Sequence, residues 1–118
     1  MNKVTMIGNL TADPQTIKTK NDKLITTFTI AVDRRFTGEE KQVDFFKVKA
    51  FGNLANIISE YVGKGSKIAV DGVLQTTEWT DNDGVVRRGV EIIADEVEFI
   101  HTRKKEEEHA TGNRRRRN

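Results

Sequence analysis

The sequence predicts an all-β domain with a single short helix, and three observations support this fold class. Most segments between residues 3 and 100 alternate apolar and polar side chains with the period of two that is typical of β-strands. The helical spacing of apolar residues occurs only in residues 53–62. The turn sequence Asn82-Asp83-Gly84 separates two long alternating segments, as in a β-hairpin.

Three strands are predicted in the first half of the chain, over residues 3–10, 24–33 and 43–51. The second of these strands has one apolar face, which consists of Phe28, Ile30 and Val32. Pro14 and the dipeptide Asn21-Asp22 indicate turns between the first and second strands. Residues 15–20 are a candidate for a further short strand between these turns.

One amphipathic helix is predicted over residues 53–62. Its apolar stripe follows the spacing i, i+3, i+4 and i+7 and consists of Leu54, Ile57, Ile58 and Tyr61. Asn53 is a suitable N-cap, because its side chain can accept a hydrogen bond from a free backbone N–H group of the first turn. Gly63 can adopt the left-handed conformation that ends many helices, so we expect the helix to stop there.

Two long strands are predicted after the helix, over residues 67–79 and 88–100. The predicted core face of the first strand consists of Ile68, Val70, Gly72 and Leu74. In the second strand the apolar set changes parity between Ile92 and Val97. A strand cannot change parity without an extra residue, so we expect a β-bulge near residues 94–96.

The predicted order of three strands, one helix and two strands is that of the OB-fold, a five-stranded Greek-key barrel with its helix between strands 3 and 4. A ferredoxin-like fold would require a second helix, which the sequence does not indicate. The predicted domain covers residues 1–102, a length that is sufficient for a single hydrophobic core.

Residues 103–118 are expected to form a flexible, disordered basic tail. They include no Val, Leu, Ile or aromatic residue, so they cannot bury enough apolar surface to offset the entropy lost on ordering. Residues 101–118 carry 7 Lys and Arg against 3 Glu, whereas residues 1–100 carry 13 Lys and Arg against 15 Asp and Glu. The globular part, with a net charge of −2, must therefore bind any phosphate through a local basic patch.

The strand over residues 43–51 has the most informative functional pattern. Because side chains alternate between the faces of a strand, one face is a plain core face of Phe46, Val48 and Ala50. The other face combines aromatic rings with ammonium groups: Phe45, Lys47, Lys49 and Phe51. Rings that stack on bases and lysines that contact phosphates are typical of single-stranded nucleic-acid binding. The alternative is a strand buried on both faces, with the lysine stems lying along apolar surface.

Two further aromatic residues, Phe36 and Trp79, fall outside the predicted core. Phe36 follows two arginines in a charged loop, and Trp79 lies among acidic residues at the start of the second hairpin. We therefore predict four residues that stack on bases: Phe36, Phe45, Phe51 and Trp79. The predicted phosphate contacts are Arg34, Arg35, Lys47, Lys49, Lys64 and Lys67. For Phe51 a place in the core beside the helix stays open, and a solvated surface explains any single basic residue equally well.

Catalytic and metal-dependent functions are not indicated by the sequence. The chain has no Cys, and both His residues lie at or beyond residue 101, away from Ser59 and Ser66, so no catalytic triad can be assembled in the domain. Residues 63–66 resemble the end of a phosphate-binding loop, but they follow the predicted helix instead of preceding one. We therefore expect a protein that is not an enzyme and that has no cofactor or metal.

No segment of the chain indicates export or membrane insertion. The first residues lead directly into a predicted strand, without the apolar core of a secretory signal. No run approaches the roughly 20 apolar residues of a membrane span. We therefore expect a cytoplasmic protein that makes no contact with membranes.

A series of short motifs occurs along residues 1–100: Asn2-Lys3-Val4, Ile7-Gly8-Asn9-Leu10, Asp13-Pro14, Phe51-Gly52-Asn53-Leu54-Ala55, Ser59-Glu60-Tyr61, Lys64-Gly65-Ser66, Asp71-Gly72-Val73-Leu74-Gln75-Thr76, Trp79-Thr80-Asp81 and Gly84. Their sequences and separations resemble those of bacterial and phage single-stranded DNA-binding proteins, the SSB family. The resemblance implies an OB-fold, a homotetramer and sequence-independent binding of single-stranded DNA in replication, recombination and repair. It implies base stacking at the four aromatic residues that the strand pattern already indicates.

The chain departs from this family in two respects. Well-known members carry Trp at the positions of Phe36 and Phe45, and Phe offers a smaller ring for stacking. Members usually end in an acidic tip that recruits replication and repair enzymes, whereas this chain has arginines at residues 114–117. We therefore do not expect enzyme recruitment through an acidic tail. The alternative function is an RNA-binding or primosome-associated OB module, which a comparison of dT and rU strands would distinguish.

Overall fold

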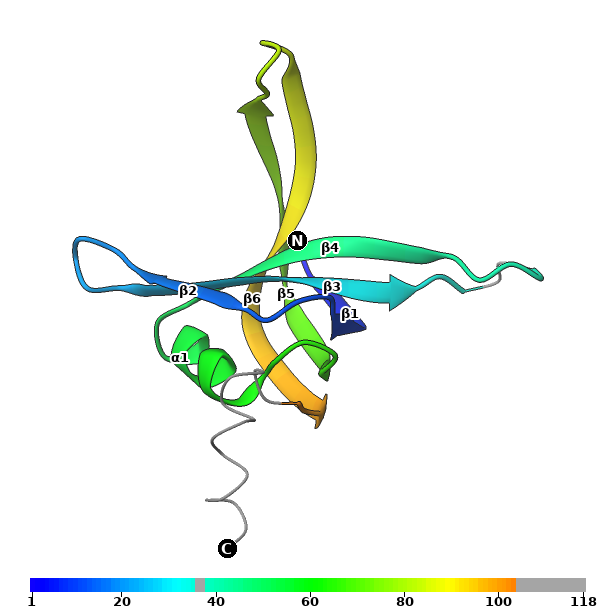
Figure 1. The fold of residues 1–118 in the computed structure, drawn as a ribbon, viewed down its shortest axis with the longest axis horizontal. Coiled ribbons are helices and arrows are strands. Elements are labelled where there is room, and N and C mark those ends of the chain that lie inside the picture. The colour runs from blue at the N-terminus through cyan, green and yellow to red at the C-terminus, as the bar shows by residue number, and fades with distance from the viewer. Residues whose placement is uncertain (36–37, 104–118) are drawn as a thin grey trace, which may run out of the picture.

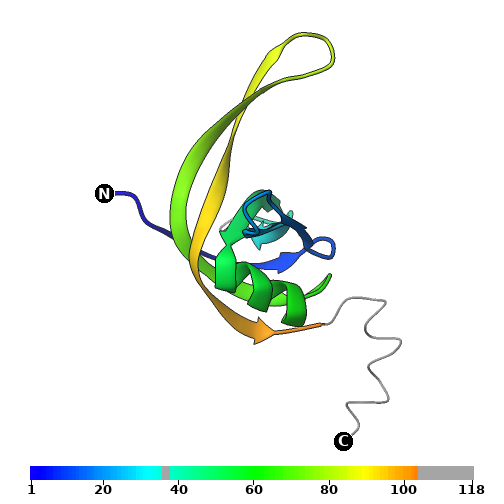
Figure 2. The same cartoon turned by 90° about the vertical axis from the view of Figure 1, so that its left-hand side faces the viewer.

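In this computed structural model the described residues, 1–35 and 38–103, form a six-stranded sheet and one helix. The elements follow one another as β1 (Val4–Leu10), β2 (Gln15–Lys18), β3 (Leu24–Asp33), β4 (Val43–Phe51), α1 (Gly52–Tyr61), β5 (Lys67–Thr80) and β6 (Val86–His101). Figure 1 shows that β5 and β6 continue beyond the rest of the molecule as a long hairpin. The helix lies on the opposite side of the sheet from the tip of that hairpin (Figures 1 and 2).

The sheet closes into a barrel. Its strand order is β1-β5-β6-β4-β3-β2, and an additional pairing of β1 with β3 closes it, through Asn9 with Ala31 and Leu10 with Ile30. Among the described strands every pairing is antiparallel except that of β4 with β6. A closed barrel of this kind, with its helix between β4 and β5, is an OB-fold, so the predicted fold class is confirmed.

The sheet has six strands, whereas the sequence predicts five, and the additional strand is β2. It occupies the candidate segment after Pro14, and it pairs only with β3, at the end of the strand order. All four residues of β2 are exposed. A strand without a buried face needs no apolar alternation, which is why the sequence pattern indicates it only weakly.

The core lies between the inner faces of the strands and one side of α1. It consists of Leu10, Phe28, Ile30, Val48, Ala50, Ala55, Ile58, Val62, Ile68, Val70, Ile92 and Ala94. The apolar faces predicted for residues 24–33 and 43–51 are confirmed, because all their members either belong to this set or, like Val32 and Phe46, are partly buried against it. Leu74 is an exception, because it is 36% exposed. It lies in the second half of β5, where no residue is buried.

The helix begins and ends differently from the prediction. It begins at Gly52, whose φ of 66° turns the chain directly out of β4, so Asn53 lies inside the first turn and does not cap it. It ends before Val62, which is extended. In the following loop Gly65, and not Gly63, has the left-handed conformation.

The buried side of α1 is rotated relative to the predicted stripe. Ala55 and Ile58 are buried, whereas Ile57 and Tyr61 are 40% and 50% exposed. The small side chain of Ala55 allows the helix backbone to approach β3. There the buried hydroxyl of Thr26 donates a hydrogen bond to the Ala55 carbonyl oxygen at 2.9 Å.

The predicted bulge in the last strand is confirmed. The register between β5 and β6 shifts after Asp71, so that Asp95 of β6 is left without a paired residue on β5. Gly72 lies opposite this bulge, where a Cβ atom would come within 2.0 Å of the Ile93 carbonyl oxygen. The bulge bends β6, and the same strand can then close the barrel and extend into the hairpin.

The predicted turns at Asn21-Asp22 and Asn82-Asp83-Gly84 are also present. Asp22, between β2 and β3, has a φ of 64°. At the tip of the β5–β6 hairpin, Gly84 has a φ of 81° and its N–H donates to the Asp81 carbonyl oxygen at 3.0 Å. The Asp81 side chain closes this turn, because its Oδ1 accepts hydrogen bonds from the backbone N–H groups of Asp83 and Val85, both at 2.9 Å.

Candidate nucleic-acid interface

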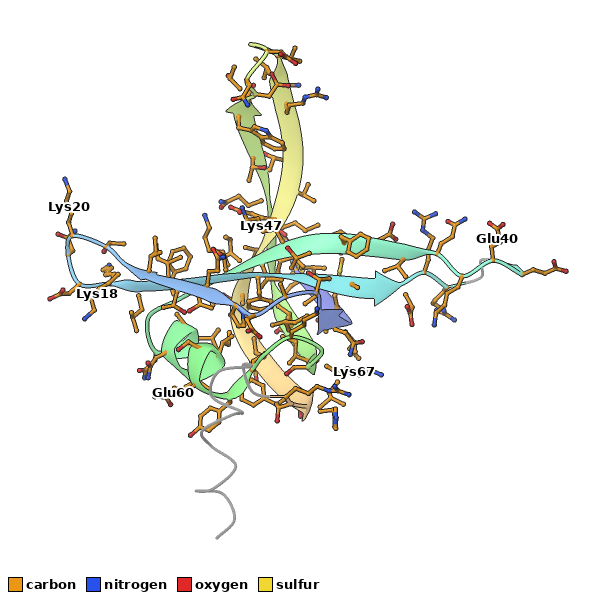
Figure 3. All side chains as sticks on the ribbon, in the orientation of Figure 1. Lys18, Lys20, Glu40, Lys47, Glu60 and Lys67 are labelled. Carbon is orange, nitrogen blue, oxygen red and sulfur yellow. The ribbon has the colours of Figure 1, made fainter. Side chains whose placement is uncertain are left out.

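A groove of about 720 Å³ lies where β4 crosses the base of the β5–β6 hairpin. Its lining comes from β3, β4, β5 and β6 and consists of Thr29, Phe45, Lys47, Lys49, Thr77, Glu78, Trp79, Gly89, Val90 and Glu91. Figure 3 shows Lys47 at this crossing. The groove therefore brings together one face of β4 and one face of the hairpin, which lie far apart in the sequence.

Two aromatic rings are open to solvent in the groove. Phe45 of β4 is 65% exposed and Trp79 of β5 is 51% exposed. Large apolar side chains that remain exposed and gather at one place mark a binding surface. Their flat faces can stack on nucleic-acid bases.

The position of Trp79 depends on a glycine in the neighbouring strand. Gly89 of β6 lies under the indole, and a Cβ atom at Gly89 would be 3.4 Å from Cζ3 and 3.5 Å from Cη2 of Trp79. The missing side chain leaves room for the ring to lie against the β6 backbone. Gly89 has no signal in the sequence, because nothing in the local pattern reveals that the ring of Trp79, diagonal to it on the neighbouring strand, covers it.

Phe51 lies in a second hollow and not in the groove. Its neighbours there come from the β2–β3 turn and the start of α1: Asp22, Lys23, Leu24, Gly52, Asn53 and Asn56. Phe51 is 46% exposed, so the alternative that it belongs to the core is wrong. It shares the outward face of β4 with Phe45, and the predicted alternation of this strand is confirmed.

The two lysines between these rings differ in their surroundings. Lys47 is exposed and has no ion-pair partner within the described part of the chain. The Nζ atom of Lys49 lies 3.6 Å from Oε2 of Glu91, a carboxylate that is buried in the groove. Gln75 donates a hydrogen bond from Nε2 to the same oxygen at 3.1 Å.

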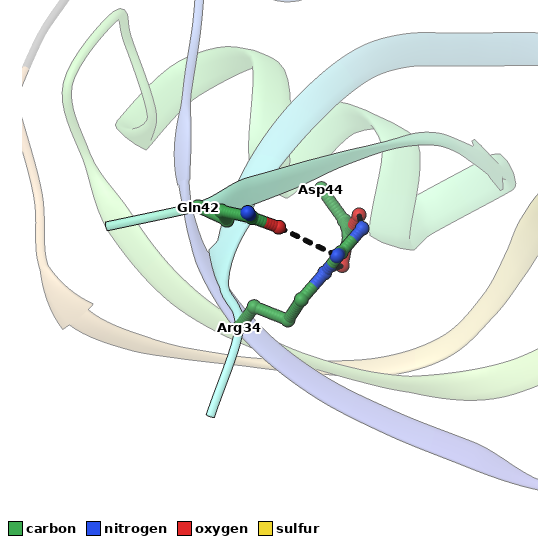
Figure 4. A network of polar contacts seen from close by, with 3 residues as sticks. All are labelled: Arg34, Gln42 and Asp44. Carbon is green, nitrogen blue, oxygen red and sulfur yellow. Dashed lines mark hydrogen bonds and ion pairs between the residues drawn. The ribbon is translucent and has the colours of Figure 1, made fainter. Parts of the chain in front are cut away.

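Arg34 makes a network at the start of the β3–β4 loop (Figure 4). Its Nη2 and Nε atoms donate to Asp44 at 2.7 and 3.1 Å, and its Nη1 donates to Gln42 at 2.6 Å. This hydrogen bonding lowers the pKa of Asp44 below its ordinary value and raises the pKa of Arg34. Arg35 is exposed beside it, and Phe36 lies outside the described residues.

Lys64 and Lys67 do not line the groove. Lys64 lies in the loop after α1, where its backbone N–H donates to Asp13 Oδ1 at 2.7 Å. Lys67 begins β5 and pairs with Asn9 of β1. Figure 3 shows Lys67 well away from Lys47. These two residues therefore lie apart from the aromatic residues of the groove, and their contacts with phosphate stay a prediction.

A metal centre or a membrane segment is not apparent. Within residues 1–35 and 38–103, no three His, Cys, Asp or Glu side chains are placed to hold a metal ion. In the same part of the chain, no helix has the length and apolar character to cross a membrane.

Comparison with known proteins shows the family of the chain. The family model described as the single-strand binding protein family matches residues 1–100. The chain belongs to this family. The resemblance that the motifs indicate is thereby confirmed, and the groove of rings and lysines has the composition that a single-strand binding protein requires.

Several named relatives cover most of the chain. Single-stranded DNA-binding protein 2 of Streptococcus agalactiae serotype III is 42% identical over 104 residues, which are 86% of this chain and 79% of that protein. The single-stranded DNA-binding protein of Clostridium tetani is 40% identical, over 85% of this chain and 70% of its own length. Single-stranded DNA-binding protein 2 of Listeria monocytogenes is 36% identical, over 96% of this chain and 72% of its own length.

Proposed function

We propose that this member of the single-strand binding family binds single-stranded DNA along β4 and acts in replication, recombination and repair by covering the exposed strand. The observation that carries this proposal is the presence of two open rings, Phe45 and Trp79, beside the exposed ammonium of Lys47 in one groove. We propose that it acts by binding alone and catalyses no reaction.

Base stacking supplies most of the binding free energy in this proposal. Each stack of a base on an aromatic ring is worth about 1–3 kcal/mol and depends little on the base, because every base has a flat face. Phe45 and Trp79 hold bases in the groove, and Phe51 holds a base further along β4. The DNA strand would then run along β4, and Phe36, outside the described residues, stays a predicted stacking residue.

Phosphate contacts are assigned first to Lys47, which is exposed on β4 and has no ion-pair partner among the described residues. Arg35, which is exposed at the start of the loop that precedes β4, is a second candidate. The guanidinium of Arg34 is occupied by Asp44 and Gln42, so its main role is to hold this loop. Lys64 and Lys67 would contact the nucleic acid only if it is long enough to continue beyond the groove.

We further propose a homotetramer in the cytoplasm, with residues 1–102 as the binding domain and residues 103–118 as a basic tail. An exposed apolar side chain on β1, Ile7 at 49%, is consistent with contact between subunits. The mass of the protein in solution, with and without a dT oligomer, tests the tetramer. A monomeric mass in both conditions would contradict it.

Trp79 provides a direct test of the binding site, because it is the only Trp in the chain. Stacking on a base should quench its emission, so titration with poly(dT) should lower the fluorescence to a saturating value. Duplex DNA of the same length is the control and should have little effect. Unchanged emission at saturating poly(dT) would remove Trp79 from the site, and tighter binding of rU than of dT would reassign the ligand to RNA.

A further inference from the structure

Glu91 is the only buried charged side chain within the described part of the chain, with 4% of its surface exposed. It lies on β6 and lines the groove. A carboxylate is unexpected there, because it repels the phosphates of a nucleic acid and loses hydration on burial. Neighbouring side chains must therefore offset the free-energy cost of burying this charge.

Two neighbouring strands provide this compensation. Lys49 of β4 places Nζ 3.6 Å from Glu91 Oε2, and Gln75 of β5 donates to the same oxygen at 3.1 Å. Because β6 lies between β4 and β5 in the sheet, Glu91 links the two strands that carry Phe45 and Trp79. The Lys49 side chain is only 31% exposed, in contrast to the open side chain of Lys47.

We propose that Glu91 is a positioning residue that holds the Lys49 ammonium in the groove and keeps it from pairing with a DNA phosphate. This inference rests on the proposed binding of single-stranded DNA in the groove. Transfer of Lys49 to a phosphate would leave the Glu91 charge buried with Gln75 alone, which is unfavourable. Lys49 therefore serves as a fixed part of the surface under the bases, and Lys47 makes the phosphate contact.

The substitution Glu91→Gln tests this role through the salt dependence of binding. Glutamine keeps the shape of the side chain and an oxygen that can accept the hydrogen bond from Gln75, but it removes the charge that holds Lys49. Lys49 can then pair with a phosphate, and the slope of log affinity for a dT oligomer against log salt should steepen by about 0.7. For each tenfold dilution of salt, the variant should gain about fivefold more affinity than the wild type does.

Two further variants separate this effect from a change in net charge. Glu98→Gln removes the same charge from β6 at a site outside the groove, and its slope should equal that of the wild type. Lys49→Met should lower the affinity, because it leaves the Glu91 carboxylate unpaired in the groove. It should nevertheless leave the wild-type slope unchanged, because Lys49 contacts no phosphate. In the double variant Glu91→Gln/Lys49→Met the steepening should disappear.

Several outcomes would overturn the role of Glu91. A Glu91→Gln slope equal to that of the wild type would do so, and so would a Lys49→Met slope that is shallower by about 0.7. An equal steepening in Glu98→Gln would assign the effect to net charge. If Glu91→Gln binds a dC oligomer more weakly than the wild type does, with an unchanged salt slope, Glu91 instead contacts the edges of bases.

Failure of this inference and failure of the proposed site give different results. If poly(dT) quenches Trp79 in the wild type but the Glu91→Gln slope is unchanged, the groove binds DNA and only the role of Glu91 is wrong. If poly(dT) leaves Trp79 emission unchanged, the groove itself is not the binding site. The Lys49→Met measurement does not depend on the Glu91→Gln variant, so it tests the inference even if that variant unfolds.

Discussion

The open rings of Phe45 and Trp79 allow a test of stacking by single substitutions. Phe45→Ala and Trp79→Ala should each weaken binding of a dT oligomer by about 1–3 kcal/mol, because each removes the surface on which one base stacks. Titration of a labelled oligomer measures this loss. Tyr61→Ala is a matched control, since Tyr61 is similarly exposed at 50% but lies on α1, outside the groove. Wild-type affinity in both groove variants would contradict the assignment.

Gly89 allows a second test, which changes the position of Trp79 without removing the ring. In Gly89→Val the added methyl groups should displace the indole, whose ring atoms lie only 3.4–3.5 Å from the position of a Cβ atom. Affinity for dT should then fall toward that of Trp79→Ala, and the emission of Trp79 should change before DNA is added. The conservative change Val86→Ile, on an exposed residue of the same strand, should have neither effect.

The sequence predicts the residues of the groove that lie on one strand but not those that act across strands. Alternation along β4 correctly places Phe45 and Phe51 outside the core, since the period of two is a local property. Glu91 is different, because its role depends on the parallel pairing of β6 with β4, which opposes Glu91 to Lys47. No local pattern reveals that pairing.

At the scale of elements, the apolar pattern fails where a buried face is absent or where a small residue makes the contact. The exposed strand β2 has no face to bury, so its sequence is uninformative. In α1 the pattern favours the larger Ile57, whereas the buried contact is made by Ala55, whose carbonyl accepts the Thr26 hydrogen bond. Close approach of two elements selects small side chains, which hydrophobic spacing does not detect.

The bulge in β6 should make Gly72 sensitive to the smallest substitution. In Gly72→Ala the new methyl group would be 2.0 Å from the Ile93 carbonyl oxygen, so the two strands must separate locally. We expect the free energy of unfolding to fall by about 1–3 kcal/mol, the usual cost of overpacking. Denaturant titration measures this change. Gly89→Ala, where the nearest side-chain atom is 3.4 Å away, is the control and should be nearly neutral.

The turn at the tip of the β5–β6 hairpin should loosen in acid. The pKa of Asp81 lies below its ordinary value, because its carboxylate accepts hydrogen bonds from the Val85 N–H and from Arg87. A carboxylate with a folded-state pKa below the unfolded value stabilises the fold above the unfolded pKa. This contribution disappears as the pH falls through the folded-state pKa.

Amide hydrogen exchange measures this loosening. The protection of the Val85 amide should decrease at low pH in the wild type. In Asp81→Asn the protection should depend much less on pH, because the carboxamide cannot titrate. An equal pH dependence in the two proteins would show that another group controls the turn.

At the scale of the whole molecule, charge is unevenly distributed. The globular part carries −2 and residues 101–118 carry +4, so the tail supplies most of the long-range attraction for phosphate. Removal of residues 103–118 should slow association with single-stranded DNA at low salt and matter little at high salt, where charges are screened within a few ångströms. Stopped-flow mixing measures the rate. An unchanged or faster rate in the shortened protein would contradict a role for the tail.

The order of the elements along the chain predicts the whole fold better than the pattern of single residues does. The order of strands and helix predicts the barrel, and the motifs of residues 1–100 predict the family. Lys64 and Lys67 lie outside the groove, and their contacts with phosphate stay a prediction, because the sequence does not say on which side of a closed barrel a side chain lies. Closure itself depends on the short pairing of β1 with β3, which involves only the ends of both predicted segments.

The late position of β6 has a consequence for synthesis of the protein on the ribosome. Three predicted stacking residues, Phe45, Phe51 and Trp79, all emerge before β6. This last strand supplies Gly89 and Glu91 and joins the hairpin to β4. A nascent chain that ends near residue 85 already contains these rings but has no groove to hold them. If the groove binds single strands as proposed, binding requires β6, and we expect a chain that ends near residue 85 not to bind a dT oligomer.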